Sequence, residues 1–464
     1  QDDASVPYKK NGYVYYTRFE KGDDYALYCR KKGAETAPEE IMLNGPEMGK
    51  GKAYFAIGGS SVSPDNKLLA YSVDLVSRRE YTIHVKDLTT GKNLSDKIAN
   101  TEGSAIWAND NKTIFYTKKD PITLRSSQIY KHVIGTDQKD DQLVYEEKDD
   151  TFGCSIYKSK SGDYLMIVSY QTLSTEYQFL DANTPNGEWK VIQPREKDHE
   201  YSVSQYEDHF YIITNDGAKN FKLMKTPVTK TEKTNWLEVI PHRADVLLEN
   251  IDIFKNHYVL SERKNGLNTL RVVNWADNSE HYIQFRDPAY MAYTTTNVEF
   301  DSEELRYGYT SLTTPNTVYD YNMRTRAQIQ RKQTEVMDKN FSPDNYLSER
   351  VFATVRDGAK VPISIVYKEG TKLDGTAPLL LYAYGSYGSS MDAYFSSVRL
   401  SLLDRGFIFA IAHIRGGQEM GREWYENGKL LKKKNTFNDF IDCGDYLVKN
   451  KYTAPDHLYA MGGS

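Results

Sequence analysis

Short hydrophobic runs alternate with tight polar turns from about residue 8 to residue 330. The polar turn sequences recur about every 45 to 55 residues, and each precedes a strand-like run such as Leu68–Val73. The turns are Lys10–Gly12, Ser63–Asn66, Ala108–Asn111, Ser161–Asp163, Glu207–His209, Lys255–His257 and Ser302–Glu304. This period, with about four strands per unit, predicts a seven-bladed β-propeller. A pair of irregular β-sandwiches is the alternative, but seven evenly spaced units fit sandwiches poorly.

The pattern changes after a polar stretch, 327–347, which lacks periodicity and is interpreted as a linker. Two strand-like runs lie on either side of Arg356–Lys360 and predict a hairpin. Continuous apolar runs predict buried strands at Pro378–Tyr384, Phe407–Ile414 and Leu458–Met461. Apolar positions in Phe437–Asn450 follow a helical period. Strands joined through a helix predict a parallel sheet with crossovers, so we expect an α/β domain over 341–464, after a propeller with its linker over 1–340.

Composition agrees with a β-rich protein of more than one domain and excludes several classes. The chain has 464 residues, of which 37 are tyrosine, a residue suited to half-buried strands. A net charge of −5 argues against a nucleic-acid surface. The three cysteines and nine histidines show no disulfide or metal spacing, so we expect no metal and no cofactor. No apolar run predicts a membrane helix, and no targeting segment is visible, although the chain starts at Gln1 without a methionine.

The last apolar run leads directly into Gly462-Gly463-Ser464. A strand that delivers a serine onto a turn lined by small residues is typical of a hydrolase nucleophile elbow, G-x-S-x-G. Ser464 is therefore the predicted nucleophile, and the acid and base of its triad are expected after it, outside this chain. A Gly-Gly-Ser linker or tag remnant is the alternative for these three residues alone.

Two further strand ends carry candidate chemistry. Tyr384 ends the run before a loop with two glycines, where its hydroxyl could stabilise an oxyanion; packing at the sheet edge is the alternative. His413 and His457 are interpreted as structural rather than as the general base. Lys432–Lys434 is interpreted as a solvated helix entry rather than an anion site.

The order of these motifs resembles the oligopeptidase B branch of the prolyl oligopeptidase family of serine peptidases. The resemblance extends from propeller to elbow, over Arg78–Tyr81, Trp107–Asp110, Tyr145–Asp150, Lys197–Tyr201, Tyr307–Tyr309, Tyr384–Gly388, Ser401–Phe407, Arg415–Gly417, Trp424–Lys429, Lys432–Asp439 and Tyr459–Ser464.

The resemblance implies a seven-bladed propeller over an α/β-hydrolase domain and cleavage of short peptides after Arg or Lys. It implies that Ser464 is the nucleophile, that the Tyr384 hydroxyl helps to form the oxyanion hole and that Tyr387 lies near the substrate. Many members have Asp-Ala-Asp where this chain has Asp392-Ala393-Tyr394, so one carboxylate is left for a second basic residue and a dibasic preference is in doubt.

We therefore expect a serine oligopeptidase with trypsin-like specificity that forms an acyl-enzyme and whose propeller excludes folded proteins. The expected partners are short peptides with basic residues and the remaining C-terminal part of the catalytic domain, with neither nucleic acid nor membrane. Arg78 and Arg79 are candidates for salt bridges that close the domains, with solvated strand ends as the alternative. A proline-specific or acylaminoacyl-specific relative and a non-catalytic propeller binding module are the rival hypotheses. The expected compartment is the cytoplasm, with the periplasm as the alternative.

Overall fold

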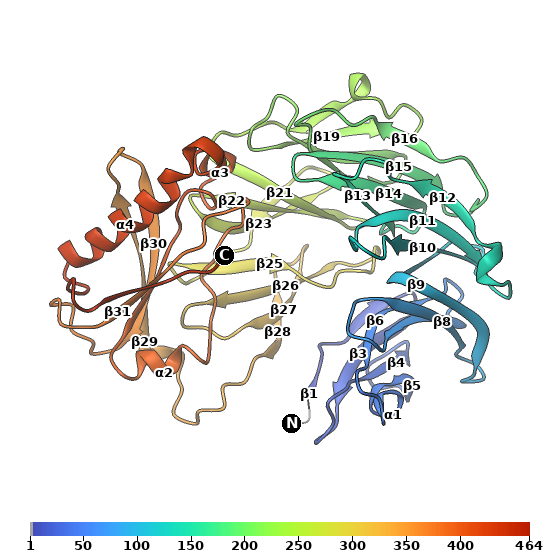
Figure 1. Cartoon of the computed structure of the whole chain (residues 1–464), viewed down its shortest axis with the longest axis horizontal. Coiled ribbons are helices and arrows are strands. Elements are labelled where there is room, and N and C mark those ends of the chain that lie inside the picture. The colour runs from blue at the N-terminus through green and yellow to red at the C-terminus, as the bar shows by residue number, and fades with distance from the viewer. Residues whose placement is uncertain (1–2) are drawn as a thin grey trace. The chain divides into compact units, whose positions relative to one another are not determined.

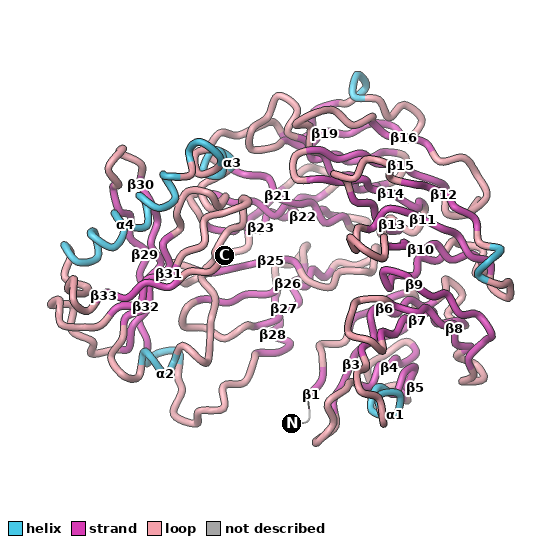
Figure 2. The backbone as a smooth tube through the Cα atoms, in the orientation of Figure 1, coloured by secondary structure: helices cyan, strands magenta, loops and turns pink. Residues whose placement is uncertain are grey.

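The structure is a computed structural model that describes residues 3–464, and strands dominate it up to residue 333 (Figures 1 and 2). The chain divides into two compact units. Unit 1 extends to residue 214 and includes 223–239 and 298–300, and unit 2 contains 215–222, 240–297 and 301–464.

Unit 1 consists of β-sheets in which most consecutive strands are neighbours. The first sheet contains β1 (Asp3–Ala4), β2 (Tyr8–Lys10), β3 (Tyr13–Phe19), β4 (Leu27–Lys32) and β5 (Glu39–Asn44). The second contains β6 (Ala56–Val62), β7 (Leu68–Asp74), β8 (Tyr81–Asp87), β9 (Asn93–Trp107), β10 (Thr113–Lys119), β11 (Ser126–Val133) and β12 (Gln142–Glu146). Two four-stranded sheets follow: β13 (Gly153–Lys158), β14 (Tyr164–Gln171), β15 (Ser174–Asp181) and β16 (Lys190–Gln193), then β17 (Tyr201–Tyr206), β18 (His209–Thr214), β19 (Lys222–Pro227) and β20 (Leu237–Ile240). The short helices are α1 (Gly45–Gly49), η1 (Gln138–Asp140) and η2 (Lys233–Asn235).

Unit 2 begins with two more four-stranded sheets of the same kind. They contain β21 (Val246–Ile253), β22 (His257–Lys264), β23 (Leu267–Asn274) and β24 (Glu280–Tyr282), then β25 (Tyr290–Thr294), β26 (Glu304–Ser311), β27 (Thr317–Asn322) and β28 (Gln328–Gln333). The last of these strands corrects the sequence analysis, because β28 lies in the stretch interpreted as a linker. Its sequence, Gln-Ile-Gln-Arg-Lys-Gln, is an edge strand with one apolar residue, so it carries no hydrophobic period.

The prediction of seven blades is wrong. Between residues 3 and 333 the strands form six hydrogen-bonded sheets, of which five have the four or five strands of a single blade and one has seven strands. The reason lies in β9, which continues for 15 residues and pairs with β8 in its first part and with β10 in its second part. Two of the predicted units are therefore one continuous sheet.

The seven polar turns themselves lie between strands as predicted, and several of them hydrogen-bond to the next turn along the chain. The side chain of Asn11 donates to the Pro64 carbonyl at 2.7 Å, and Asn111 accepts from the Asp65 N–H at 2.8 Å. Further bonds of this kind join Asn109 to Gly162 and, in unit 2, Asn256 to Glu303. The turn residues that mark the repeat thus also join neighbouring repeats.

The C-terminal part of unit 2 is a five-stranded sheet with helices on its faces. The strands are β29 (Tyr346–Thr354), β30 (Lys360–Lys368), β31 (Leu379–Tyr382), β32 (Ile408–Ala412) and β33 (Leu458–Met461), in the order β29-β30-β32-β31-β33. The helices are η3 (Pro343–Asn345), α2 (Leu400–Leu403), α3 (Arg422–Glu426), η4 (Leu430–Lys432) and α4 (Lys434–Lys449). The predicted hairpin is confirmed by antiparallel pairing of β29 with β30, and β31 is parallel to both β32 and β33.

Both faces of this sheet are buried, which explains its continuous apolar runs. In β30, Ile363 and Ile365 pack on the face covered by α4, while Val366 packs on the face covered by α2. The third predicted buried strand differs, because β33 is half-exposed and Tyr459 and Met461 are 51% and 47% exposed. Within the described residues β33 pairs only with β31, so it is an edge strand.

We expect Ile365→Ala to lower the free energy of unfolding by about 2–5 kcal/mol, because Ile365 is fully buried and its removal leaves a cavity. Ile329→Ala in β28 is the matched control, because Ile329 is 64% exposed and its loss should cost less than about 0.5 kcal/mol. Urea unfolding followed by tryptophan fluorescence measures both variants. Equal losses would contradict this assignment of the core.

Candidate active site

The carboxyl ends of three parallel strands, β32, β31 and β33, meet at one edge of the sheet. A pocket of about 470 Å³ opens there, at the position where open α/β sheets bind their ligands. Its lining residues are Ala383, Tyr384, Ser386, Ile414, Lys433, Thr436, Phe437, Phe440, Ala460, Met461, Gly462, Gly463 and Ser464. The structure thus brings Ser464 and Tyr384, which are 80 positions apart in the sequence, to one pocket.

Ser464 follows β33 in a left-handed backbone conformation, with φ at +56°. A serine seldom adopts this region, and a strained turn at the end of a strand is the geometry of a nucleophile elbow. Local sterics do not require glycine at the two preceding positions, since a Cβ on Gly462 would lie 3.4 Å from the Ala383 carbonyl oxygen and one on Gly463 would meet nothing. The positive φ of Ser464 fits the predicted elbow, and the role of Ser464 as nucleophile stays a prediction.

The loop after β31 carries Tyr384 and is packed closely against its neighbours. Gly385 has φ at +73°, and a Cβ there would lie 2.7 Å from Thr436 Cγ2. The Gly388 N–H donates to the Gly416 carbonyl at 2.9 Å, and Gln418 donates to the Gly388 carbonyl at 3.1 Å. The loop is thus attached to the loop that follows β32, and only glycine fits at the closest contact.

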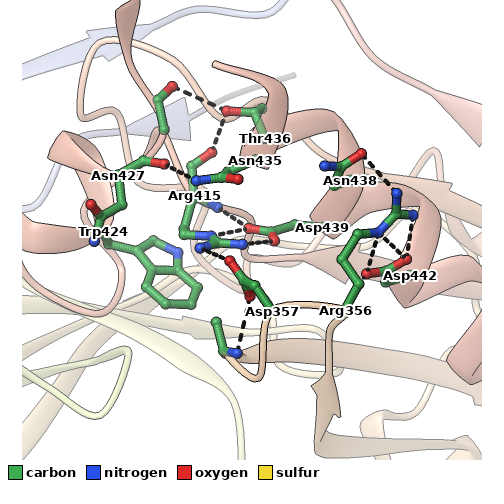
Figure 3. A network of polar contacts seen from close by, with 12 residues as sticks. Arg356, Asp357, Arg415, Trp424, Asn427, Asn435, Thr436, Asn438, Asp439 and Asp442 are labelled. Atoms are coloured by element: carbon green, nitrogen blue, oxygen red, sulfur yellow. Dashed lines mark hydrogen bonds and ion pairs between the residues drawn. The ribbon is translucent and has the colours of Figure 1, made fainter. Parts of the chain in front are cut away.

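The loop after β32 is itself fixed by a buried ion pair between Arg415 and Asp439 (Figure 3). The Arg415 guanidinium donates to both carboxylate oxygens of Asp439, at 2.9 and 2.6 Å, and the Arg415 N–H donates to the same carboxylate at 3.0 Å. Arg415 also pairs with Asp357 in the β29–β30 turn at 2.6 Å, and this hydrogen bond lowers the pKa of Asp357. One arginine therefore joins the β32 loop, helix α4 and the hairpin turn.

The other predicted site residues lie outside the pocket lining. Tyr387 is 79% exposed with φ at +55°. Asp392 forms a bidentate ion pair with Arg263 of β22, at 2.6 and 3.1 Å, and Glu249 of β21 accepts from the same guanidinium at 3.0 Å. The carboxylate predicted to meet a basic residue of the substrate is thus already paired with a cation of this chain. The roles of Tyr387 and Asp392 toward a substrate stay predictions.

Arg78 and Arg79 belong to unit 1, in the segment between β7 and β8. The Arg78 side chain is largely exposed and lies 4.0 Å from Glu80, and the Arg79 N–H donates to the Asp74 carboxylate at 2.8 Å. Their role in closing the domains stays a prediction.

Two buried titratable groups lie near the β31 and β32 loops. His413 bonds through Nε2 to the Ser364 hydroxyl at 2.7 Å, and burial lowers its pKa to about 4. Glu419 accepts from the Met391 N–H at 2.8 Å, and burial raises its pKa to about 7. Nothing in the sequence singles out Glu419, because a carboxylate in a glycine-rich loop gives no sign of burial.

Other kinds of site receive no support from residues 3–464. No helix in this range is long and apolar enough to cross a lipid bilayer. Nor does this part of the chain group three His, Cys, Asp or Glu side chains where they could hold a metal ion.

Comparison with known proteins places both parts of the chain in one family. The family model described as "Prolyl oligopeptidase, N-terminal beta-propeller domain" matches residues 1–334, and that described as "Prolyl oligopeptidase family" matches 393–464. Dipeptidyl aminopeptidase BI of Pseudoxanthomonas mexicana is 44% identical over 481 residues, which cover 100% of this chain and 66% of that protein. Protease 2 of Moraxella lacunata is 35% identical, with 100% and 67% covered.

The structure of oligopeptidase B from Leishmania major aligns with a TM-score of 0.92 at 35% identity, covering 99% of this chain and 66% of that one. The closed form of oligopeptidase B from Trypanosoma brucei with covalently bound antipain aligns with a TM-score of 0.91 at 34% identity, with the same coverage. The chain therefore spans about two thirds of the length of these relatives.

We expect Arg415→Met to lower the free energy of unfolding by about 3–5 kcal/mol, because Asp439, whose side chain is fully buried, would lose its cation. Arg415→Lys should recover only part of this loss, since an ammonium cannot make the bidentate contact. Arg356→Met is the matched control in the same network, because the Arg356 side chain is 50% exposed in its ion pair with Asp442, so its loss should cost less. Thermal and urea unfolding measure all three variants. A loss for Arg356→Met as large as that for Arg415→Met would contradict the importance of burial.

The stability that Glu419 contributes should depend on pH. Its folded pKa of about 7 lies above the ordinary value of 4.5, so the folded chain holds the proton more tightly than the unfolded chain. The contribution is complete below about pH 4.5 and is lost as the pH rises through about 7, and it amounts to roughly 3 kcal/mol.

Glu419→Gln, which stays neutral, should therefore gain stability relative to the wild type between about pH 5 and about pH 8 in thermal unfolding. The exposed Glu423→Gln in α3 is the control and should show no such trend. If the difference in stability between Glu419→Gln and the wild type is the same at both pH values, the raised pKa of Glu419 is refuted.

Proposed function

The chain belongs to the prolyl oligopeptidase family, and from this premise we propose that it carries the nucleophile of a serine peptidase that cleaves short peptides after Arg or Lys. The observation that carries the proposal is the shared pocket of Ser464 and Tyr384, and the positive φ of Ser464 directly after β33, expected of a nucleophile elbow, supports it. The similarity to oligopeptidase B structures and to Protease 2 supports this class of peptidase.

In the proposed reaction the Ser464 hydroxyl attacks the carbonyl carbon of the scissile bond, and a general base takes its proton. The negative charge that develops on the carbonyl oxygen accepts a hydrogen bond from the Tyr384 hydroxyl and another from the backbone N–H after the nucleophile. The amine then leaves and an acyl-enzyme remains, which water hydrolyses. The general base and its acid are proposed to come from the remaining third of the protein, as are the carboxylates that select Arg or Lys.

Release of dipeptides from the amino terminus is a second candidate activity. The 44% identity to dipeptidyl aminopeptidase BI favours it. The pairing of Asp392 with Arg263 also fits a subsite that does not require a second basic residue. A blocked peptide ending in arginine amide and a free dipeptide amide with the same arginine distinguish the two activities, because only an endopeptidase cleaves the blocked substrate well.

We expect Ser464→Ala in the complete protein to abolish labelling by a fluorophosphonate probe and to lower kcat/KM by at least about 10⁴-fold, because the nucleophile is lost. Ser401→Ala on α2 is the matched control and should keep both properties, since Ser401 is exposed and bonds only to the Val398 carbonyl in its own turn. Labelling that survives in Ser464→Ala and disappears in Ser386→Ala would show that the other serine of the pocket is the nucleophile.

A further inference from the structure

Lys433 attaches the start of α4 to the loop that carries Tyr384. Its Nζ donates to the Gly385 carbonyl oxygen at 2.5 Å and to the Ser386 hydroxyl at 2.8 Å. These acceptors belong to the two residues that directly follow Tyr384. The bond spans 48 positions in the sequence, so it joins two segments that the strand order alone does not fix.

The Gly385 carbonyl is confined on its other side as well. A Cβ on Gly416 would lie 1.9 Å from this oxygen, so the backbone of the β32 loop is in direct contact with it. On Gly385 itself, a Cβ would lie 2.7 Å from Thr436 and 2.8 Å from Ile414. The peptide after Tyr384 therefore lies between a rigid backbone and the Lys433 ammonium, and it has few other positions to adopt.

Lys433 differs from the lysines on either side of it. It is the only charged side chain among the residues that line the pocket, and it is partly buried, which lowers its pKa. Lys432 and Lys434 are exposed, and Lys432 bonds to the Asn427 side chain at 2.8 Å. The interpretation of all three lysines as a solvated helix entry therefore fails for the middle residue.

We propose that Lys433 is a positioning residue for catalysis: by fixing the Gly385 carbonyl and the Ser386 hydroxyl, it directs the Tyr384 hydroxyl toward the oxyanion that forms at Ser464. The inference rests on the proposed function. An oxyanion donor contributes only when it lies at hydrogen-bond distance from the developing charge, so freedom of this loop reduces the rate of the chemical step. It does not change ground-state binding, because Lys433 is already occupied by its bonds to the loop.

The test is a double-mutant cycle in the complete protein with a blocked arginine amide substrate. We expect Lys433→Met to lower kcat by about 10-fold with KM within about 2-fold, and Tyr384→Phe to lower kcat by about 10²-fold. In the double variant the loss should equal that of Tyr384→Phe within about 2-fold, because Lys433 acts through that hydroxyl. Lys432→Met, the matched control at the exposed neighbouring position, should keep the wild-type kcat.

Independent, multiplied losses in the double variant would overturn the inference, since a general structural role for Lys433 gives that result. Thermal midpoints check that the variants are folded. If Lys433→Met does not fold, the same double-mutant cycle is measured with Lys433→Gln in its place. If Tyr384→Phe lowers kcat and the Lys433 variants do not, only the role of Lys433 is refuted. If Tyr384→Phe leaves kcat unchanged, the proposed oxyanion hole is refuted together with the role of Lys433.

Discussion

The candidate site depends on the buried ion pair between Arg415 and Asp439. Its geometry requires the loop after β32 to meet the first turns of α4, and the Asp357 contact requires the β29–β30 turn to be present at the same place. A nearly buried guanidinium that pairs with two carboxylates tolerates few alternative arrangements. Because the β31 loop is attached to this same β32 loop, the positions of Tyr384 and the pocket wall follow from the ion pair.

Small residues make these contacts sterically feasible. Gly385 and Gly416 touch backbone to backbone, and Gly416 has φ at +107°. A single Cβ on Gly416 would push the β31 loop away from the β32 loop, to which Gln418 attaches it, and a Cβ on Gly385 would meet Thr436 and Ile414. In the sequence these glycines look like ordinary turn residues, but they set the distance between the loops that form the pocket wall. The charged residues Arg415 and Lys433 fix how these loops are oriented.

Local pattern predicted most of the strands, the polar turns and helix α4, because each of these follows from period and strand order, and it placed Ser464 and Tyr384 at strand ends. The local pattern failed where the structure depends on contacts between residues that are far apart in the sequence. The length of β9 merges two expected units into one sheet, although Asn100 and Gly103 in its middle have positive φ and its strand pairings shift register there. Lys433 was missed because its acceptors lie 48 and 47 positions away, and the pairing of Asp392 because Arg263 lies in another sheet.

The Arg263–Asp392 pair joins segments 129 residues apart within unit 2, and both side chains are nearly buried. The pair therefore joins the sheet of β21–β24 to the loop that follows β31 of the α/β sheet. A chimera that exchanges the whole propeller between relatives at about residue 340 separates this arginine from its acid. A crossover point near residue 240 keeps the two together.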